Sequence, residues 1–306
     1  MKNPAANRIV ALCGAVSALA CSTVPTESSN HEQLLVPWAS LSGRIAYSRV
    51  EFCESPMNLC SALFVIDAGK QTITTIYSTD SDYAGVVSLA WTSDGRIGYH
   101  TIATNGFTPF EVFAIDPSVR KRVHVTTGSY PTWSATGELA NNCSLGLCID
   151  GALPYPGLGA NGRAAWMPDG VHLIASQSDS TSQSSLYLIS ITDSAARAAL
   201  RQSPPPNNRE YYTDPAISPD GTHVAYVCHG CGTPSNTSIW VMSVNGTGAV
   251  ALTTPSDFGE SEPAWSPDGT QIAFMRSSSL MVMGADGSGQ VPLVAATDVS
   301  SVAWGH

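Results

Sequence analysis

The sequence predicts an all-β chain folded as a six-bladed β-propeller of four-stranded antiparallel blades, with the ring closed by the C-terminal strand joining the first blade. Three observations carry this prediction: a recurring five-residue turn motif, the spacing of its copies, and the apolar runs that accompany each copy. The clearest copy is Trp-Ser-Pro-Asp-Gly at residues 265–269. Its Pro and Asp favour a turn and its Gly takes the positive φ of the bend, so the motif joins two strands.

Five weaker copies of the motif lie at residues 91–95, 133–137, 166–170, 217–221 and, cut short by the end of the sequence, 303–306. Their aromatic or large apolar positions are 91, 133, 166, 217, 265 and 304, so neighbouring copies are 42, 33, 51, 48 and 39 residues apart. Propeller blades repeat about every 40–50 residues, so six copies indicate six blades. The interval of 33 residues predicts a short blade near residues 129–157.

Each repeat contains four short apolar runs. In the last complete repeat these runs are residues 262–265, 270–275, 280–283 and 291–294. The third run recurs at residues 63–66, 112–115, 186–191 and 239–244. Four strands per repeat is the composition of a propeller blade, and no amphipathic helical pattern of useful length interrupts the series.

The two ends of the predicted ring complete each other. The first repeat has strands at residues 44–47, 63–66 and 73–76 but no strand that ends in the motif aromatic, whereas residues 301–304 form such a strand with nothing after it. We therefore expect the C-terminal strand to be the inner strand of the first blade, because this arrangement removes exposed sheet edges.

The motif Pro-Ala-Trp-Ser-Pro-Asp-Gly at residues 263–269, followed by a strand and then by an aliphatic strand ending in Asp-Gly, resembles the repeat of the TolB-like (WD40-like) β-propeller family. The resemblance covers residues 40–306 and implies a scaffold, because the repeat specifies no chemistry. TolB carries an α/β domain before its propeller, whereas only about twenty residues separate the exported N-terminus from the first blade here, so we expect neither that domain nor its TolA-binding role.

Composition favours an exported, acidic, single-domain protein. Charged residues are 12% of the chain and its net charge is −10. Removal of residues 1–20 takes away Lys2 and Arg8 and no acid, which gives −12 for the mature form. Such a charge disfavours binding to nucleic acid and electrostatic docking on anionic lipid.

The N-terminus has the features of an export signal: basic residues Lys2 and Arg8, an apolar stretch at residues 9–19, and small or apolar residues before Cys21. Residues 17–21 resemble the bacterial lipobox, which implies that Cys21 is lipidated. The alternative is ordinary signal-peptidase cleavage. We expect a signal peptide at residues 1–20, a lipid-anchored tether at 21–39 and the propeller at 40–306. The protein is then an outer-membrane lipoprotein or a protein of the periplasm or cell surface, and a lipid anchor is its sole contact with the membrane.

Six further cysteines form three close pairs, each between the second and third strands of a predicted blade; the pairs are Cys53 with Cys60, Cys143 with Cys148, and Cys228 with Cys231. Disulfides are expected in an exported protein. The rival interpretation treats Cys228-His-Gly-Cys231 as a redox or zinc motif. A structural zinc needs four ligands and a redox site needs a βα context, and neither is evident.

Catalytic and cofactor motifs are sparse. The sequence has no Gly-x-Ser-x-Gly elbow, no His-Glu-x-x-His and no phosphate-binding Gly-rich loop, so we expect no cofactor and no metal. The recurring Asp of the turns is a turn former, and the motif Trp residues are expected to be buried between adjacent blades.

One set of positions varies between repeats although the scaffold does not require it: the residue three before each motif aromatic. These residues are Ser88, Tyr130, Arg163, Asp214, Glu262 and Ser301. The inner strands of a propeller line its channel, so these side chains are predicted to meet at one mouth, with Tyr130, Arg163, Asp214 and Glu262 as the binding candidates. The alternative is that they only contact water and one another. We expect them to be exposed, so that Ala at Arg163 and Asp214 leaves stability almost unchanged.

The predicted function is that of a monomeric, non-catalytic binding module of the bacterial envelope, which presents its channel mouth and loops to an envelope protein or a glycan. The alternative is a hydrolase or lyase with its site at the same mouth, since propellers host such enzymes. A cluster of His and carboxylates at the mouth would favour the enzyme.

Overall fold

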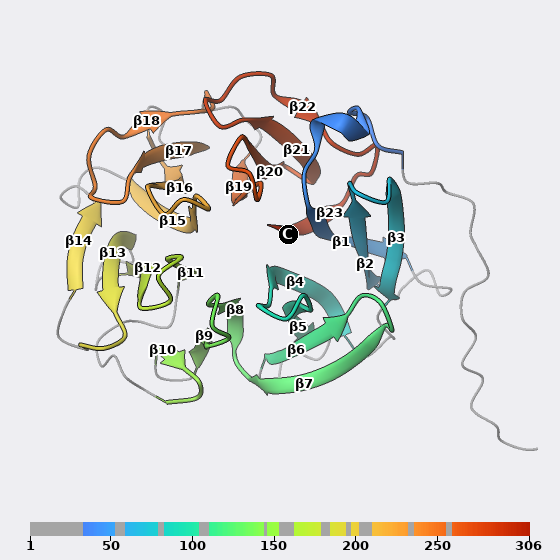
Figure 1. Cartoon of the computed structure of the whole chain (residues 1–306), viewed down its shortest axis with the longest axis horizontal. Coiled ribbons are helices and arrows are strands. Elements are labelled where there is room, and N and C mark those ends of the chain that lie inside the picture. The colour runs from blue at the N-terminus through green and yellow to red at the C-terminus, as the bar shows by residue number, and fades with distance from the viewer. Residues whose placement is uncertain are drawn as a thin grey trace, which may run out of the picture. The chain divides into compact units, whose positions relative to one another are not determined.

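The computed structural model describes residues 33–52, 59–78, 83–103, 110–143, 146–152, 162–178, 184–193, 197–201, 210–231, 236–254 and 259–306. Their strands form six antiparallel sheets arranged around a central axis (Figure 1). The predicted six-bladed β-propeller is therefore confirmed. A single turn of 3₁₀-helix, η1 (Trp38–Ser40), precedes the first blade.

The blades follow the chain in order, and the inner strand is given first for each. Blade 1 contains β23 (Val299–Gly305), β1 (Arg44–Phe52), β2 (Leu59–Asp67) and β3 (Thr72–Ser78). Blade 2 contains β4 (Tyr83–Trp91), β5 (Ile97–Ala103), β6 (Glu111–Asp116) and β7 (Lys121–Thr127). Blade 3 contains β8 (Ser129–Trp133), β9 (Leu139–Cys143) and β10 (Gly146–Ile149).

Blade 4 contains β11 (Ala164–Trp166), β12 (His172–Ser178), β13 (Ser184–Ser190) and β14 (Arg197–Arg201). Blade 5 contains β15 (Tyr211–Ile217), β16 (His223–His229), β17 (Thr237–Ser243) and β18 (Val250–Ala251). Blade 6 contains β19 (Glu260–Trp265), β20 (Gln271–Arg276), β21 (Ser279–Gly284) and β22 (Val291–Pro292). Within the described part of the chain, blade 3 is three-stranded, in agreement with the short interval between its motif and the next.

The C-terminal strand closes the ring. β23 pairs antiparallel with β1, with Ile45 opposite Trp304 and Ser48 opposite Ser301. Trp304 is 9% exposed and packs in a core cluster shared with blade 6. The predicted closure is confirmed.

The propeller unit begins before residue 40. The backbone N–H of Leu35 donates to the carbonyl of Leu293 at 2.9 Å, and Leu34 forms a β-bridge with Val294. Leu34 and Trp38 pack against the core between blades 6 and 1. Residues 33–39, which the sequence-based boundary assigned to the tether, therefore lie on the outer edge of blade 6, because their apolar side chains are partly buried there.

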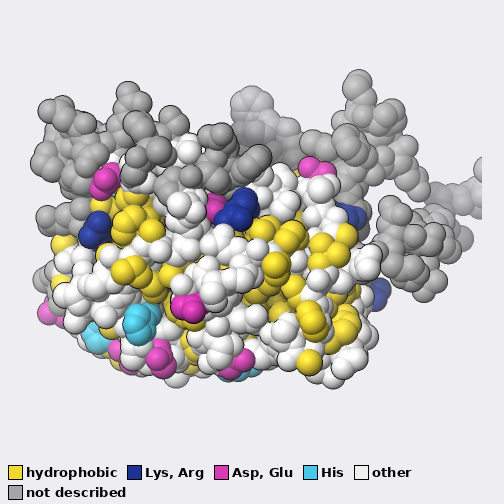
Figure 2. Space-filling view, turned by 90° about the horizontal axis from the view of Figure 1, so that it is seen from above, with side chains coloured by type: hydrophobic (Ala, Val, Ile, Leu, Met, Phe, Trp, Pro, Cys, Tyr) yellow, Lys and Arg dark blue, Asp and Glu magenta, His cyan; other side chains and the backbone are white. Residues whose placement is uncertain are grey.

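Apolar residues of neighbouring blades form the core. In the described part of the chain the buried residues group into five clusters, and each cluster combines side chains of two adjacent blades. The motif tryptophans add hydrogen bonds across these seams: Nε1 of Trp91 donates to Ala303 at 3.4 Å, and Nε1 of Trp265 donates to Ala216 at 3.1 Å. Each large side chain buried in this way contributes about 1.5–3 kcal/mol. The side of the molecule shown in Figure 2 is mainly uncharged, with charged side chains scattered over it and Asp, Glu and His side chains along its lower rim.

The recurring turn has the role predicted for it. Asp268 accepts hydrogen bonds from Ser266 Oγ at 2.7 Å and from the N–H of Thr270 at 3.0 Å, and Gly269 has φ +70°. Burial would raise the pKa of Asp268, but these hydrogen bonds outweigh it and lower the pKa. A hydrogen bond from Ser218 likewise lowers the pKa of Asp220 to about 2. The turn carboxylates are therefore ionised and bound within their own turns.

Two of the predicted disulfides are present. Cys143 is joined to Cys148 with a Cα–Cα distance of 5.9 Å, and Cys228 to Cys231 with a distance of 5.8 Å. The first disulfide joins β9 to β10, and the second joins β16 to the residues that follow it. The proposed pair Cys53 and Cys60 lies outside the residues whose side chains the structure describes, as does Cys21. Over the described ranges no helix is long and apolar enough to cross a membrane.

Candidate functional site

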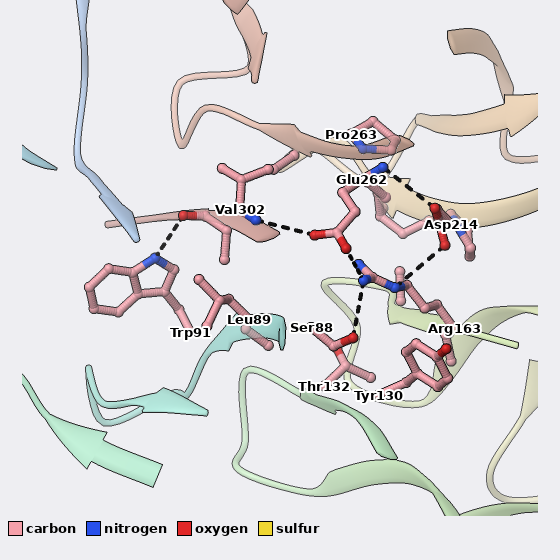
Figure 3. A pocket seen from close by; sticks show the side chains of 18 of the residues that line it. Ser88, Leu89, Trp91, Tyr130, Thr132, Arg163, Asp214, Glu262, Pro263 and Val302 are labelled. Carbon is pink, nitrogen blue, oxygen red and sulfur yellow. Dashed lines mark hydrogen bonds and ion pairs between the residues drawn. The ribbon is translucent and has the colours of Figure 1, made fainter. Parts of the chain in front are cut away.

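The six residues that precede the motif aromatics converge at the axis. Figure 3 shows the side chains of Ser88, Tyr130, Arg163, Asp214 and Glu262 directed toward one another around a pocket. Five of the six residues lie on innermost strands, and Arg163 immediately precedes β11. We call this set the axial ring; its members are Ser88, Tyr130, Arg163, Asp214, Glu262 and Ser301.

The backbone of four ring residues is left-handed. The φ angles are 55° for Ser88, 52° for Tyr130, 49° for Asp214 and 53° for Glu262. Each of these residues lies at a β-bulge between the first and second strands of its blade. A left-handed φ costs a non-glycine residue about 1–2 kcal/mol, and bulges redirect side chains out of the regular pleat. The chain tolerates this cost at the same place in four blades, and the result is that polar side chains point into the channel.

Arg163 is the centre of the ring. Its Nη2 donates to Ser88 Oγ at 3.0 Å and to Glu262 Oε1 in a shorter contact, and its Nε lies 3.4 Å from Asp214 Oδ1. The guanidinium carbon lies 5.5 Å from the centre of the Tyr130 ring, within the range of a cation–π interaction. The side chains of Arg163 and Asp214 are 20% exposed and that of Glu262 is 10% exposed.

Glu262 extends this network to blade 1. Its Oε2 accepts hydrogen bonds from Ser301 Oγ at 2.6 Å and from the N–H of Val302 at 3.2 Å. The hydroxyl of Ser301 in turn accepts from the N–H of Leu89 at 3.1 Å. Side chains of all six blades are therefore joined through Arg163 and Glu262.

The expectation that the ring residues are exposed is wrong. They are mostly buried because side chains of all six blades meet around Arg163 and Glu262 and cover one another. Burial alone would lower the pKa of Arg163, but Glu262 and Asp214 outweigh it and raise the pKa. The ring therefore holds one cation and two carboxylates in a largely desolvated position.

A histidine that the sequence did not single out lies behind Tyr130. The N–H of Tyr130 donates to Nδ1 of His100 at 3.2 Å, and the two rings are 5.2 Å apart in an edge-to-face arrangement. Burial, assisted by the charge of Arg163, lowers the pKa of His100 to about 3. His100 is thus neutral at physiological pH and supports the backbone of Tyr130. His100 lies 30 residues before Tyr130 in the sequence, and nothing in the sequence indicated that the two residues would be in contact.

The ring opens onto a cavity of about 270 Å³. In five blades the cavity is lined by the stretch from the ring residue to the motif aromatic or, in blade 5, to Ile217; in blade 1 it is lined by residues 302–304. Polar groups therefore gather at one end of the lining, and Trp91, Trp133, Trp166, Trp265 and Trp304 at the other. A pocket that combines apolar walls with a few convergent polar groups is typical of a binding site.

The described residues contain no cluster of three or more His, Cys, Asp or Glu side chains that could hold a metal ion. The ring itself supplies hydrogen-bond donors and acceptors. Nη1 of Arg163 and the hydroxyl of Tyr130 have no hydrogen-bond partner among the described residues. The arrangement can therefore bind a polar group without first breaking its own ion pairs.

Neither a protein-family model nor a curated protein matches the chain by sequence. Solved structures do match it. TolB from Acinetobacter baumannii superposes with a TM-score of 0.68 at 21% identity, covering 86% of this chain and 67% of that one. The chain has the fold of the TolB propeller. A TolB candidate from Agrobacterium tumefaciens gives a TM-score of 0.57 at 15% identity, covering 82% of this chain and 88% of that one.

The TolB-like propeller also resembles that of an enzyme. The GH74 enzyme from Niastella koreensis has a TM-score of 0.55 at 12% identity, covering 83% of this chain and 46% of that one. These likenesses establish the fold, and a propeller fold hosts both binding proteins and enzymes. The function of this chain must therefore be argued from its own axial ring.

Proposed function

We propose that this protein is a non-catalytic binding module of the bacterial cell envelope, and that its axial ring binds a polar group of an envelope protein or a glycan. The observation that carries the proposal is the left-handed backbone at Ser88, Tyr130, Asp214 and Glu262. Glycine would adopt this φ without cost, so polar side chains at these positions favour a role for the side chains themselves. Rigid inner strands also reduce the entropy lost on binding.

The ring suits a ligand with both donors and acceptors. Nη1 of Arg163 can donate to a carboxylate, carbonyl or hydroxyl oxygen, and the hydroxyl of Tyr130 can donate or accept. Asp214 accepts weakly from the N–H of Glu262 at 3.5 Å, which leaves acceptor capacity for a ligand. Sugar hydroxyls and peptide groups both meet this description. The ring contains two carboxylates and one guanidinium, so its net negative charge disfavours a ligand that is itself highly negative.

The enzyme alternative rests on the GH74 likeness and on the presence of two carboxylates. Carboxylate-based glycoside hydrolysis needs one group as proton donor and the other as base or nucleophile. Here Asp214 and Glu262 are both paired with the same guanidinium. Two described histidines lie near the ring: His100 contacts Tyr130, and Nε2 of His229 is hydrogen-bonded to the hydroxyl of Thr213 at 2.8 Å, so neither is hydrogen-bonded to Asp214 or Glu262. This arrangement favours binding over chemistry.

Combined Tyr130→Phe and Asp214→Asn substitutions should reduce retention of a partner from solubilised envelope extract by about tenfold, since each removes about one hydrogen bond. Asn tolerates a left-handed φ, so the melting temperature should stay within a few degrees. The control is Asp286→Asn, which makes the same change in an exposed hairpin turn. Undiminished retention would place the site elsewhere on the propeller. Turnover of a glycan or ester by the wild type would overturn the binding function.

The envelope location rests on the N-terminal sequence. A Cys21→Ala variant should move from the membrane pellet to the soluble fraction, because stable anchoring requires the two or more acyl chains that this cysteine would carry. Fractionation with an antibody to the propeller measures the change. Equal membrane retention of the variant, with processing unaffected, would contradict lipidation.

A further inference from the structure

The outer strand of blade 2 is unusually exposed. In β7 every residue except Thr126 is exposed. Val123 and Val125 are 43% and 39% exposed, and Val119 in the preceding turn is 67% exposed. Figure 1 shows β7 along the outer rim of the molecule, and it pairs with β6 alone. We call residues 119–125 the β7 patch.

The exposure follows from the shortness of blade 3. Side chains alternate along a strand, so Lys121 and Val123 share one face and Arg122 and His124 the other; Val125 is the extra residue of a β-bulge in the pairing with β6. The guanidinium of Arg122 lies 5.1 Å from the ring of Tyr77 on β3, so the second face is turned toward blade 1. The face of Val123 is then turned toward blade 3. The strands of blade 3 are four or five residues long and number three in the described chain, so none covers Val123.

The β7 patch is also basic, although the protein as a whole is acidic. Arg120, Lys121 and Arg122 are consecutive, whereas the whole chain has 14 Lys and Arg against 24 Asp and Glu. The side chains of Arg120 and Lys121 form no ion pair or hydrogen bond with any described residue. Cations often protect an edge strand from pairing with itself, but the exposed valines on either side of these cations do not serve that purpose.

We propose that β7 binds an acidic, extended segment of a partner protein, which adds to blade 2 as a fifth strand. An open strand edge offers backbone hydrogen bonds, and alternate side chains of the added strand determine specificity. Acidic side chains would lie near Arg120 and Lys121, and apolar ones beside Val123 and Val125. A second copy of this chain is disfavoured because it would bring together two identical basic edges. The proposal is independent of the function of the axial ring.

The test uses the full chain and a fluorescent seven-residue peptide of alternating glutamate and valine, which matches the length of β7. Anisotropy should show saturable binding that weakens with salt. An Arg120→Gln, Lys121→Gln variant should bind about tenfold more weakly. The control variant Lys70→Gln changes an exposed lysine in the corresponding hairpin of blade 1 and should bind as the wild type does.

Two further peptides test the geometry. A lysine and valine peptide, and a glutamate and valine peptide with a central proline, should both bind at least about tenfold more weakly, because proline cannot donate to the strand ladder. Equal binding of either peptide, or equal binding by the double variant, would overturn the proposal. So would a concentration-dependent dimer of the wild type that the double variant abolishes, since the occupant would then be a second copy.

Discussion

A chain that ends at Thr297 should lose most of its stability and aggregate. The truncation removes β23 and with it Trp304, which is buried in the core between blades 6 and 1. It also exposes the edge of β1 and leaves Glu262 without its bonds from Ser301 and Val302. Losing one buried tryptophan costs about 3–5 kcal/mol, and domains of this kind have a total stability of about 5–15 kcal/mol. Thermal unfolding and light scattering measure the effect.

A milder truncation serves as the control. A chain that ends at Gly305 lacks His306 alone, whose carbonyl accepts a bond from Arg44 in an exposed position, and should melt within a few degrees of the full chain. A synthetic peptide of residues 298–306 should restore part of the lost stability when added to the longer truncation. If the chain ending at Thr297 keeps the melting temperature and solubility of the full chain, β23 does not close the ring.

Arg163→Ala should destabilise the protein by about 3–5 kcal/mol, because it leaves the mostly buried Glu262 and Asp214 without their cation. For a chain of this size the melting temperature should fall by about 5–8 °C. Chemical denaturation at neutral pH gives the free energy of unfolding directly. This expectation replaces the sequence-based one of near neutrality, since the ring proves to be buried rather than exposed.

A double-mutant cycle separates the ion pair from other effects of the substitution. Glu262→Gln keeps acceptors for Ser301 and Val302 but removes the charge. In the Arg163→Ala background, Glu262→Gln should restore at least about 1 kcal/mol of the free energy of unfolding, because position 262 then carries no unpaired charge. If the losses in free energy of unfolding caused by the two single substitutions simply add in the double variant, Arg163 and Glu262 are not energetically coupled.

The scaffold was predictable because its signals are local. The turn motif at residues 265–269 and its copies determine hairpins, and their spacing determines the number of blades. The convergence of Arg163, Asp214 and Glu262 followed from the repeat position alone, since every inner strand approaches the same axis.

The character of the ring was not predictable from local signals. The bulges at which Tyr130 and Asp214 are left-handed involve pairing with the second strand, and the burial of Arg163 depends on side chains from four other blades. His100 enters the site through a contact between blades 2 and 3. The bare face of β7 likewise depends on the size of the neighbouring blade. Each of these features is a long-range consequence of ring closure.

Site-specific photo-crosslinking tests most directly whether the axial ring is a binding site. p-Benzoylphenylalanine would replace Tyr130, whose hydroxyl has no described partner, and in a control would replace Val291, which is 42% exposed on the outer edge of blade 6. If the ring binds an envelope component, irradiation of intact cells should give an adduct from position 130 that Asp214→Asn weakens, and none from position 291. An adduct from position 291 with none from position 130, in a variant that melts like the wild type, would contradict a binding site at the ring.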